Sequence, residues 1–310
     1  MSKRIVYTEY GTPDVLRYEA GEVPEPGPGQ VLMRTEMIGV NPIDWKLVAG
    51  AFARVDPAPF PGTPGWAATG IIEALGDGVT DYAVGQAVIA DSRARLPVTS
   101  GSLGGTFAEH VAVDTTRIAP RPERMSVEQA AALPSSAVAG YSMIEYLDIT
   151  SQDTLLVHGA AGSVGAAAVQ IAIDRGARVI GTASPRNHNY LRSLGATPVA
   201  YGDGLIDSLR SFEPITASAD AVGGRDSVTA TRAVLASEGR AVTAWGDEHS
   251  QVAGIPWVPH PDDELAQTVA LATRGALAAR IGETFPLARA ADALRLSKTG
   301  HPVGKILLAP

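Results

Sequence analysis

The sequence predicts an α/β protein that combines a doubly wound parallel sheet domain with a second, β-rich domain. Three observations lead to this prediction. About the first 120 residues hold short β-type runs between Gly and Pro, residues 154–244 alternate apolar strands with Ala-rich helices, and a glycine-rich turn follows the first of those strands. Strand and helix alternating at this spacing indicate right-handed crossovers, and therefore a parallel sheet.

The N-terminal segment is typical of short strands joined by turns. Its β-type runs occupy residues 31–35, 70–75 and 86–90. Pro24 and Pro28 come shortly before the first run, and proline cannot continue a helix or a central strand. We therefore expect an extended surface segment that leads into a series of strands.

The pattern changes at Ser126, where Ser126 and Gln129 form an N-cap signal before an Ala-rich helix. Apolar strands and helices then alternate. We expect strands at 154–158, 177–181, 219–222 and 240–244, helices at 163–175, 186–194 and 262–274, and a closing strand at 304–308.

Length, charge and cysteine content exclude several classes of protein. A chain of 310 residues indicates two domains or one large domain. The net charge of −8 repels phosphate backbones and anionic lipid, so we expect neither nucleic acid nor a membrane as partner. The absence of Cys excludes disulfides, thiolate nucleophiles and Cys-ligated zinc. With no run of about 18 apolar residues and no apolar segment behind the basic N-terminus, the sequence predicts a soluble, cytoplasmic protein.

The sharpest local signal is the loop from His158 to Gly165, where a buried-type strand runs into small residues and then a helix. This context is typical of a loop that binds the pyrophosphate of a dinucleotide. Gly162 lets the backbone approach the pyrophosphate, Gly165 lets the helix pack on the strand, and the helix N-terminus supplies free N–H groups. Ala160 stands where the usual fingerprint has its first Gly. The predicted cofactor-binding residues here are Ala160, Ala161, Gly162, Ser163, Val164 and Gly165. The alternative is a glycine turn without a ligand.

The end of the next strand predicts which dinucleotide is bound. Residues 181–188 contain no Asp or Glu that could bind the ribose 2′-hydroxyl of NAD. Ser184 and Arg186 can instead bind a 2′-phosphate through charge-assisted hydrogen bonds, which favours NADPH. Alternatively, Ser184 and Pro185 only cap the following helix and Arg186 is solvated.

Taken together, the motifs resemble those of the zinc-independent medium-chain dehydrogenase/reductase superfamily, in its quinone oxidoreductase (zeta-crystallin-like) branch. The residues that carry the resemblance are 11–16, 39–46, 61–62, 65–76, 105–110, 158–165, 194–196 and 300–305. The resemblance implies a GroES-like β-rich catalytic domain around an inserted Rossmann domain, with catalysis in the cleft. We place the first part of the catalytic domain at 1–122, the Rossmann NADPH-binding domain at 123–250, and the return to the catalytic domain at 251–310.

The resemblance also implies chemistry without metal. Zinc-dependent relatives have a Cys where this chain has Asn41, and Gly-His-Glu where it has Gly65-Trp66-Ala67. The six His residues are scattered along the sequence. We therefore expect no bound metal.

Site residues follow from the resemblance position by position. Asn41 and Asp44 resemble the active-site Asn and Asp that line the nicotinamide and substrate pocket, and Tyr201 matches a Tyr near the adenosine 2′-phosphate. We also count Val222 and Gly223 among the cofactor-binding residues. Alternatively, Asn41 only satisfies backbone groups before Pro42, Asp44 pairs with a basic surface residue, and Tyr201 is a buried anchor.

The predicted activity is NADPH-dependent hydride transfer to a quinone or an activated enone. Enoyl-thioester reductases of the superfamily have a Tyr eleven positions after the Asn as candidate proton donor, and this chain has Phe52 there. Enoyl-thioester reduction remains the alternative within enzymes, and a non-catalytic NADPH-binding sensor is the alternative from another class. The resemblance also predicts a homodimer that forms through the sheet edge at 240–246.

Overall fold

The computed structural model describes residues 1–54, 60–92, 105–212 and 214–310. The chain divides into two compact units, one formed by Met1–Ser135 with Arg280–Pro310 and the other by Ser136–Ala279. These limits differ from the expected ones at 122/123 and 250/251 because two helices pack in the unit other than the one expected for them. The helix after Ser126 packs in the first unit, and the helix after Asp263 packs in the second. Ala131 packs with Met37 and Leu307 of the first unit, and the helix over Glu264–Thr273 contacts the helix over Val138–Tyr146 of the second.

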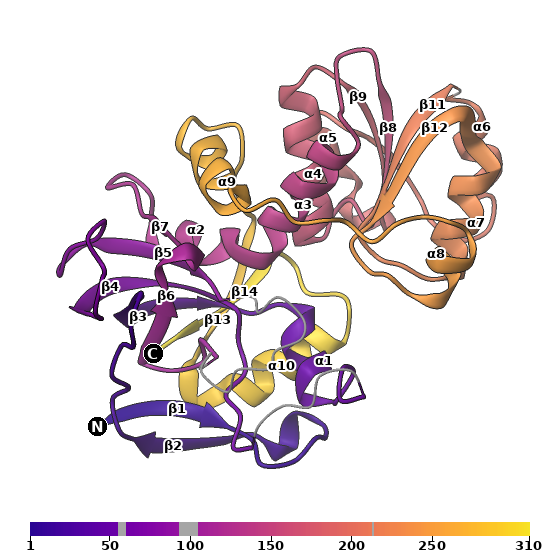
Figure 1. Cartoon of the computed structure of the whole chain (residues 1–310). Coiled ribbons are helices and arrows are strands. Elements are labelled where there is room, and N and C mark those ends of the chain that lie inside the picture. The colour runs from indigo at the N-terminus through magenta and orange to yellow at the C-terminus, as the bar shows by residue number, and fades with distance from the viewer. Residues whose placement is uncertain (55–59, 93–104, 213) are drawn as a thin grey trace. The chain divides into compact units, whose positions relative to one another are not determined.

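The first unit is built on a largely antiparallel sheet with strand order β13-β14-β3-β4-β5-β7, and β6 also pairs with β3 (Figure 1). Three of its strands overlap the predicted runs at 31–35, 70–75 and 86–90, and β14 overlaps the predicted closing strand. The strands are β3 (Gln30–Gly39), β4 (Ala67–Leu75), β5 (Ala87–Asp91), β6 (His110–Asp114), β7 (Ile118–Pro120), β13 (Ile281–Pro286) and β14 (Lys305–Ala309).

The same unit holds a separate two-stranded pair and several helices around its core. The core centres on fully buried side chains such as Phe107, Met33 and Leu294. The remaining elements are β1 (Ser2–Val6), β2 (Arg17–Gly21), α1 (Pro42–Val48), α2 (Val127–Ala132), α10 (Ala290–Lys298) and the 3₁₀ turns Pro13–Val15, Thr115–Arg117 and Leu287–Arg289. The predicted cap of α2 is present, because Ser126 Oγ accepts from Gln129 N–H at 3.2 Å. An irregular turn over Leu133–Ala137 follows α2.

The second unit is the predicted doubly wound parallel sheet. Its strand order is β10-β9-β8-β11-β12, so the chain moves outward from β8 first in one direction and then in the other. Figure 1 shows α3, α4 and α5 on one side of this sheet and α6 and α7 on the other. The strands are β8 (Thr154–His158), β9 (Arg178–Thr182), β10 (Thr197–Val199), β11 (Ile215–Asp220) and β12 (Leu235–Thr243).

The helices of the second unit alternate with these strands, as expected from the sequence. They are α3 (Val138–Tyr146), α4 (Ser163–Asp174), the 3₁₀ turn Pro185–Asn187, α5 (His188–Ser193), α6 (Leu205–Arg210), α7 (Arg225–Val234), α8 (Glu248–Val252) and α9 (Glu264–Thr273). Every residue of β8 is buried, as befits a central strand covered on both faces. Within the described ranges, no helix is long and apolar enough to cross a bilayer.

One strand prediction is wrong in position. The strand expected at 219–222 runs over Ile215–Asp220, and Val222 lies in the turn that follows. The first part of this strand was not predicted because polar residues interrupt its apolar pattern. Thr216 Oγ1 donates to Asp153 Oδ1 at 2.7 Å, and Ser218 Oγ lies 2.9 Å from Thr231 Oγ1, so both hydroxyls are satisfied inside the fold.

Candidate functional site

The glycine loop joins β8 to α4 in the second unit. Gly159 has φ +68°, a left-handed conformation that favours glycine. Its carbonyl accepts from Gly162 N–H at 3.0 Å, while Ala160 N–H donates to Thr182 O at the end of β9, also at 3.0 Å. The loop is therefore a tight turn anchored to the neighbouring strand, and it passes directly into the first turn of α4.

Gly162 and Gly165 differ in what surrounds them. A Cβ on Gly162 would meet only Gly159 O at 3.4 Å, so the backbone there borders open space. A Cβ on Gly165 would lie 2.4 Å from Gly159 O and 2.8 Å from Ala160 Cα, so this glycine lets helix and loop pack closely. Gly162 is the N-cap of α4 and provides no side-chain cap. The first N–H groups of a 12-residue helix thus begin beside an accessible backbone, which fits a pyrophosphate.

The predicted loop residues divide by accessibility. Ala160 and Gly165 are buried and serve packing. In keeping with this, a Cβ on Gly181 of β9 would lie 2.7 Å from Ala160 Cβ. The residues between them, Ala161, Gly162, Ser163 and Val164, are partly or fully exposed. A cofactor can therefore reach the middle of the loop.

Ser184 and Tyr201 follow two paired strands, which brings their loops together. Thr182 pairs with Val199 in the parallel β9–β10 ladder, and Ala183 N–H donates to Val199 O at 3.0 Å. Ser184 and Tyr201 each lie two residues beyond this pair. Tyr201 is 56% exposed, so the alternative of a buried anchor is wrong.

The side chain of Ser184 does not cap the helix that follows. Ser184 occupies the N-cap position of the 3₁₀ turn Pro185–Asn187 without a side-chain cap bond. Its Oγ accepts instead from Asn187 Nδ2 at 3.3 Å, and its carbonyl accepts from Asn187 N–H at 2.9 Å. Arg186 is exposed in the same turn. The Ser184 hydroxyl therefore has hydrogen-bonding capacity left for a ligand.

Asp220 shapes the turn that carries Val222 and Gly223. Its Oδ1 accepts from the N–H groups of both residues at 2.9 Å, and its Oδ2 accepts from Ser227 Oγ at 2.7 Å. Asp220 itself is 3% exposed. Val222 lies against the glycine loop, because a Cβ on Gly159 would meet Val222 Cγ2 at 2.5 Å. The predicted residues of the loop and of this turn thus come together at the carboxyl ends of β8 and β11.

His158, the last residue of β8, serves the fold beneath this region. It is 2% exposed, and its Nε2 lies 3.0 Å from Thr231 Oγ1. Burial lowers the pKa of His158, although the charge of Asp220 acts in the opposite direction. The ring is therefore a buried, hydrogen-bonded part of the core.

Asn41 and Asp44 belong to the first unit, where they form a buried cluster with Lys305. Their exposed fractions are 2%, 0% and 3%. Asp44 Oδ2 accepts from the backbone N–H of Asn41 at 2.7 Å, the return bond of a capping box at the start of α1. Lys305 Nζ donates to Asn41 Oδ1, and Asn41 Nδ2 donates to Gly39 O at 3.2 Å.

The contacts in this cluster test the alternative roles given for Asp44 and Asn41. Asp44 is fully buried and its neighbouring charge is the buried Lys305, so it is not paired with a basic surface residue. The bond from Asn41 to Gly39 O does satisfy a backbone group, as the alternative for Asn41 requires. That alternative does not explain why Asn41 Oδ1 accepts a hydrogen bond from the Lys305 ammonium group.

Burial perturbs the titration of both charged members of the cluster. It raises the pKa of Asp44, against the opposing effects of the Asn41 N–H and the Lys305 charge. It lowers the pKa of Lys305, against the opposing charges of Asp44 and Asp91. Asp44 Oδ1 is buried without a hydrogen-bond partner among the described residues. Shifts of this kind, produced by burial against charge, are frequent at functional sites.

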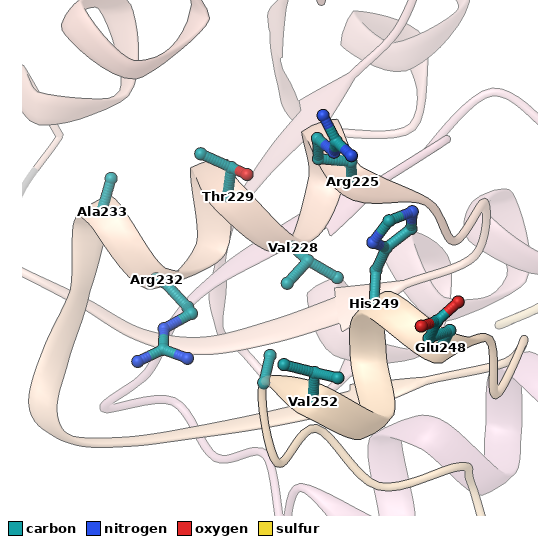
Figure 2. Close-up of a pocket in the computed structure, with 9 residues that line it drawn as sticks. Arg225, Val228, Thr229, Arg232, Ala233, Glu248, His249 and Val252 are labelled. Atoms are coloured by element: carbon teal, nitrogen blue, oxygen red, sulfur yellow. The ribbon is translucent and has the colours of Figure 1, made fainter.

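An open groove of about 660 Å³ lies elsewhere in the second unit, between α7 and α8 (Figure 2). Arg225 and Arg232 of α7 and His249 of α8 are its basic residues, while Val228 and Val252 supply apolar surface. Among the described residues, none that was predicted to bind the cofactor lines it. The groove is therefore distinct from the predicted site.

Four residues of these regions were not predicted from the sequence, namely Gly159, Asp91, Asp220 and Lys305. Two of them carry signals that could have found them. Asp220 stands before Val222 and Gly223 in a pattern typical of an Asx turn. Lys305 is the one charged residue in the apolar strand Lys305–Ala309.

Comparison with known families agrees with this geometry. The family described as the alcohol dehydrogenase GroES-like domain matches residues 27–123. The family described as zinc-binding dehydrogenase matches residues 194–308. Together the two matches span more than half of the chain.

Individual relatives are similar over nearly the whole length. A rat synaptic vesicle membrane protein VAT-1 homolog is 28% identical over 99% of this chain and 83% of its own. Human quinone oxidoreductase is 27% identical over 92% and 90%. An NADPH-dependent alkenal/one oxidoreductase of Arabidopsis thaliana chloroplasts is 27% identical over 99% and 79%.

Solved structures show the same fold. The quinone oxidoreductase of Coxiella burnetii has a TM-score of 0.88 and 28% identity, covering 100% of this chain and 99% of its own. A mycobacterial protein solved with NADPH has a TM-score of 0.85 and 26% identity, covering 99% and 100%. Fold, glycine loop and relatives agree, and the chain belongs to the medium-chain dehydrogenase/reductase superfamily of oxidoreductases, in its quinone oxidoreductase branch.

Proposed function

We propose that this protein is an NADPH-dependent reductase that transfers hydride to a quinone or an activated enone without zinc. The observation that carries the proposal is the glycine loop, whose accessible backbone at Gly162 leads into an uncapped helix N-terminus. The bound nicotinamide supplies the hydride. The task of the chain is to hold that cofactor against a polarised acceptor.

Preference for NADPH over NADH rests on the ends of β9 and β10. Ser184 and Arg186 offer a hydroxyl and a guanidinium, and Tyr201 follows the paired strand. The 2′-phosphate adds nearly two negative charges, which Arg186 can bind through charge-assisted hydrogen bonds. With no carboxylate in residues 181–188, nothing in this stretch repels it.

The chain does not fit the zinc chemistry found among its relatives. One similar structure is a thermostable alcohol dehydrogenase from Pyrobaculum aerophilum with cobalt and zinc bound. This chain has no Cys. Across the described ranges, no three His, Asp or Glu side chains are grouped so that they could hold a metal. We therefore infer that the protein contributes to hydride transfer through hydrogen bonds and positioning.

Quinones and enones suit the residues of the first unit. The acceptor oxygen needs a hydrogen-bond donor while it gains negative charge. Asn41 Nδ2 has two N–H groups and gives one to Gly39 O, so the second is left for an acceptor oxygen. Phe52 cannot donate a proton. Acceptors whose reduced oxygen takes its proton from solvent therefore fit better than enoyl thioesters.

A panel of acceptors with NADPH and NADH tests the proposal. We expect steady oxidation of NADPH with simple quinones and enones, slower oxidation of NADH, and little turnover of a 2-enoyl thioester. Turnover of the thioester alone would establish the enoyl reductase alternative. Tight NADPH binding in calorimetry without turnover of any acceptor would establish the sensor alternative.

A further inference from the structure

Backbone register brings Lys305 and Asn41 together. In the antiparallel β14–β3 pairing, Leu307 lies opposite Gly39 and Leu308 opposite Ile38. Val40 N–H then donates to Ile306 O at 2.9 Å. The same register continued by one residue sets Lys305 opposite Asn41. Their contact is thus fixed by the sheet, although the two residues are 264 positions apart.

Gly39 leaves the space that the Lys305 side chain needs. A Cβ on Gly39 would lie 3.2 Å from Lys305 Cε and 2.2 Å from the carbonyl oxygen of Ala131 in α2. Any larger residue would displace either the helix or the lysine. The close approach of Lys305 to Asn41 therefore depends on a glycine beside the site.

The lysine determines which way the Asn41 amide faces. An ammonium group has donors and no acceptor, so it binds the amide oxygen and opposes a flipped amide, which would present Nδ2. Asn41 Oδ1 is held by Lys305, and Nδ2 is held by Gly39 O. Asp44 and Asp91 lie within electrostatic range of Lys305 and compensate its buried charge. One N–H of Nδ2 is left with a fixed direction.

We propose that Lys305 is a positioning residue that fixes and polarises the Asn41 amide, so that its remaining N–H is presented to the oxygen of the acceptor. A cation on the amide oxygen draws electron density from the nitrogen and strengthens its N–H as a donor. The donor then gains most from binding an oxygen that becomes negative during hydride transfer. This inference rests on the proposed function for the identity of the acceptor, and its structural part stands without it.

The structural part is tested by NMR of the side-chain amides. The chain has only three asparagines, Asn41, Asn187 and Asn189, so selective ¹⁵N-Asn labelling gives three side-chain amide groups. Asn41→Ala assigns the signal of Asn41. We expect Lys305→Met to shift the Asn41 amide and leave the other two in place, and Lys305→Arg to restore part of the shift. An unchanged Asn41 amide in folded Lys305→Met would overturn the proposal.

The catalytic part is tested by a double-mutant cycle on kcat with a quinone. We expect Lys305→Met to lower kcat on the order of 10- to 100-fold, with the Kd for NADPH unchanged. Because Lys305 acts through Asn41, the same change made in Asn41→Ala should cost almost nothing more. If the kcat losses of the two single variants multiply in the double variant, Lys305 acts by a route other than Asn41, and the proposal is overturned.

Folding is followed by thermal unfolding of each variant. If Lys305→Met does not fold, Lys305→Gln is used in both experiments, because it keeps a neutral donor and most of the volume. It should then give an intermediate shift and an intermediate loss of kcat, and an unshifted Asn41 amide would again count against the proposal. If wild type turns over no acceptor, the proposed function fails, while the NMR result still decides the contact between Lys305 and Asn41.

Discussion

Arg186 and Arg192 lie close together in the sequence but differ in their contacts and in the roles we assign to them. Arg192 Nη1 donates to Asn189 Oδ1 at 2.9 Å on the exposed face of α5. Arg186 lies in the turn directly after the β9 loop, two residues beyond Ser184. Only Arg186 is therefore assigned to the 2′-phosphate.

We predict that Arg186→Ala weakens NADPH binding and leaves NADH binding nearly unchanged. Loss of a charge-assisted hydrogen bond costs about 1.5 to 3 kcal/mol, or roughly 10- to 150-fold in affinity. Calorimetry with both cofactors measures the difference, and Arg192→Ala is the matched control, expected to change neither. Equal weakening of both cofactors would place Arg186 on the pyrophosphate or in the fold instead.

At this scale the sequence reveals residues only where a local pattern marks them. The resemblance supplied Asn41 and Asp44, and the absence of carboxylates in residues 181–188 indicated Ser184 and Arg186. Lys305 was missed because its contact with Asn41 depends on strand register between distant segments. The single charge in the apolar strand marks Lys305 as unusual, but no local pattern identifies Asn41 as its partner.

The two glycines of the loop between β8 and α4, Gly162 and Gly165, have different surroundings in the structure. The sequence predicted that Gly162 faces a ligand and that Gly165 serves packing. The surroundings of the two glycines agree with this distinction. A Cβ on Gly162 would point into open space, whereas a Cβ on Gly165 would clash with the loop backbone. A pair of matched substitutions can therefore separate binding from folding.

We predict that Gly162→Val abolishes NADPH binding while the protein stays folded, because the branched side chain enters the space of the pyrophosphate. Gly165→Val should instead lower the melting temperature markedly, since its Cβ would lie 2.4 Å from Gly159 O. Calorimetry and thermal unfolding of both variants measure this. Unchanged NADPH affinity in folded Gly162→Val would mean that the loop is only a turn.

Elements with a continuous apolar pattern were predictable, and those with internal polar groups were not. β8 was predicted residue for residue because Thr154–His158 is a buried run bounded by turn signals. β11 was misplaced because Thr216 and Ser218 make its first half look like a loop. Their hydroxyls have partners in other segments, which only the folded chain supplies.

At the scale of the whole molecule, β12 is one of the two edge strands of the parallel sheet in the described chain, and β10 is the other. An isolated bridge from Thr243 to Trp257 covers its last residue. We predict a homodimer that pairs or packs across this edge, because an edge strand presents backbone groups beyond those that the bridge occupies. Light scattering should give about twice the chain mass of 32.1 kDa. A mass near that of one chain at micromolar concentration would contradict a dimer.

We also predict that activity requires no metal, since the chain has no Cys. Protein treated with chelator should keep its rate of NADPH oxidation, and elemental analysis should find no stoichiometric zinc. Zinc at one equivalent, together with activity lost on its removal and regained on its return, would refute this.

The division into two units also belongs to this scale, and the sequence predicted it only in outline. The alternation of patterns indicated where the Rossmann sheet begins and ends. It could not show that α2 packs in the first unit or that α9 packs on α3, because the apolar face of a helix does not indicate which element covers it.

In the proposed reaction, hydride passes from the nicotinamide to the acceptor. This transfer is tested most directly with NADPH carrying deuterium at both C4 positions and a simple enone, followed by mass spectrometry of the product. We expect a saturated ketone with one deuterium on the carbon β to the carbonyl, while the proton added to the α carbon comes from water. A ketone without deuterium, or no ketone despite bound NADPH, would contradict it.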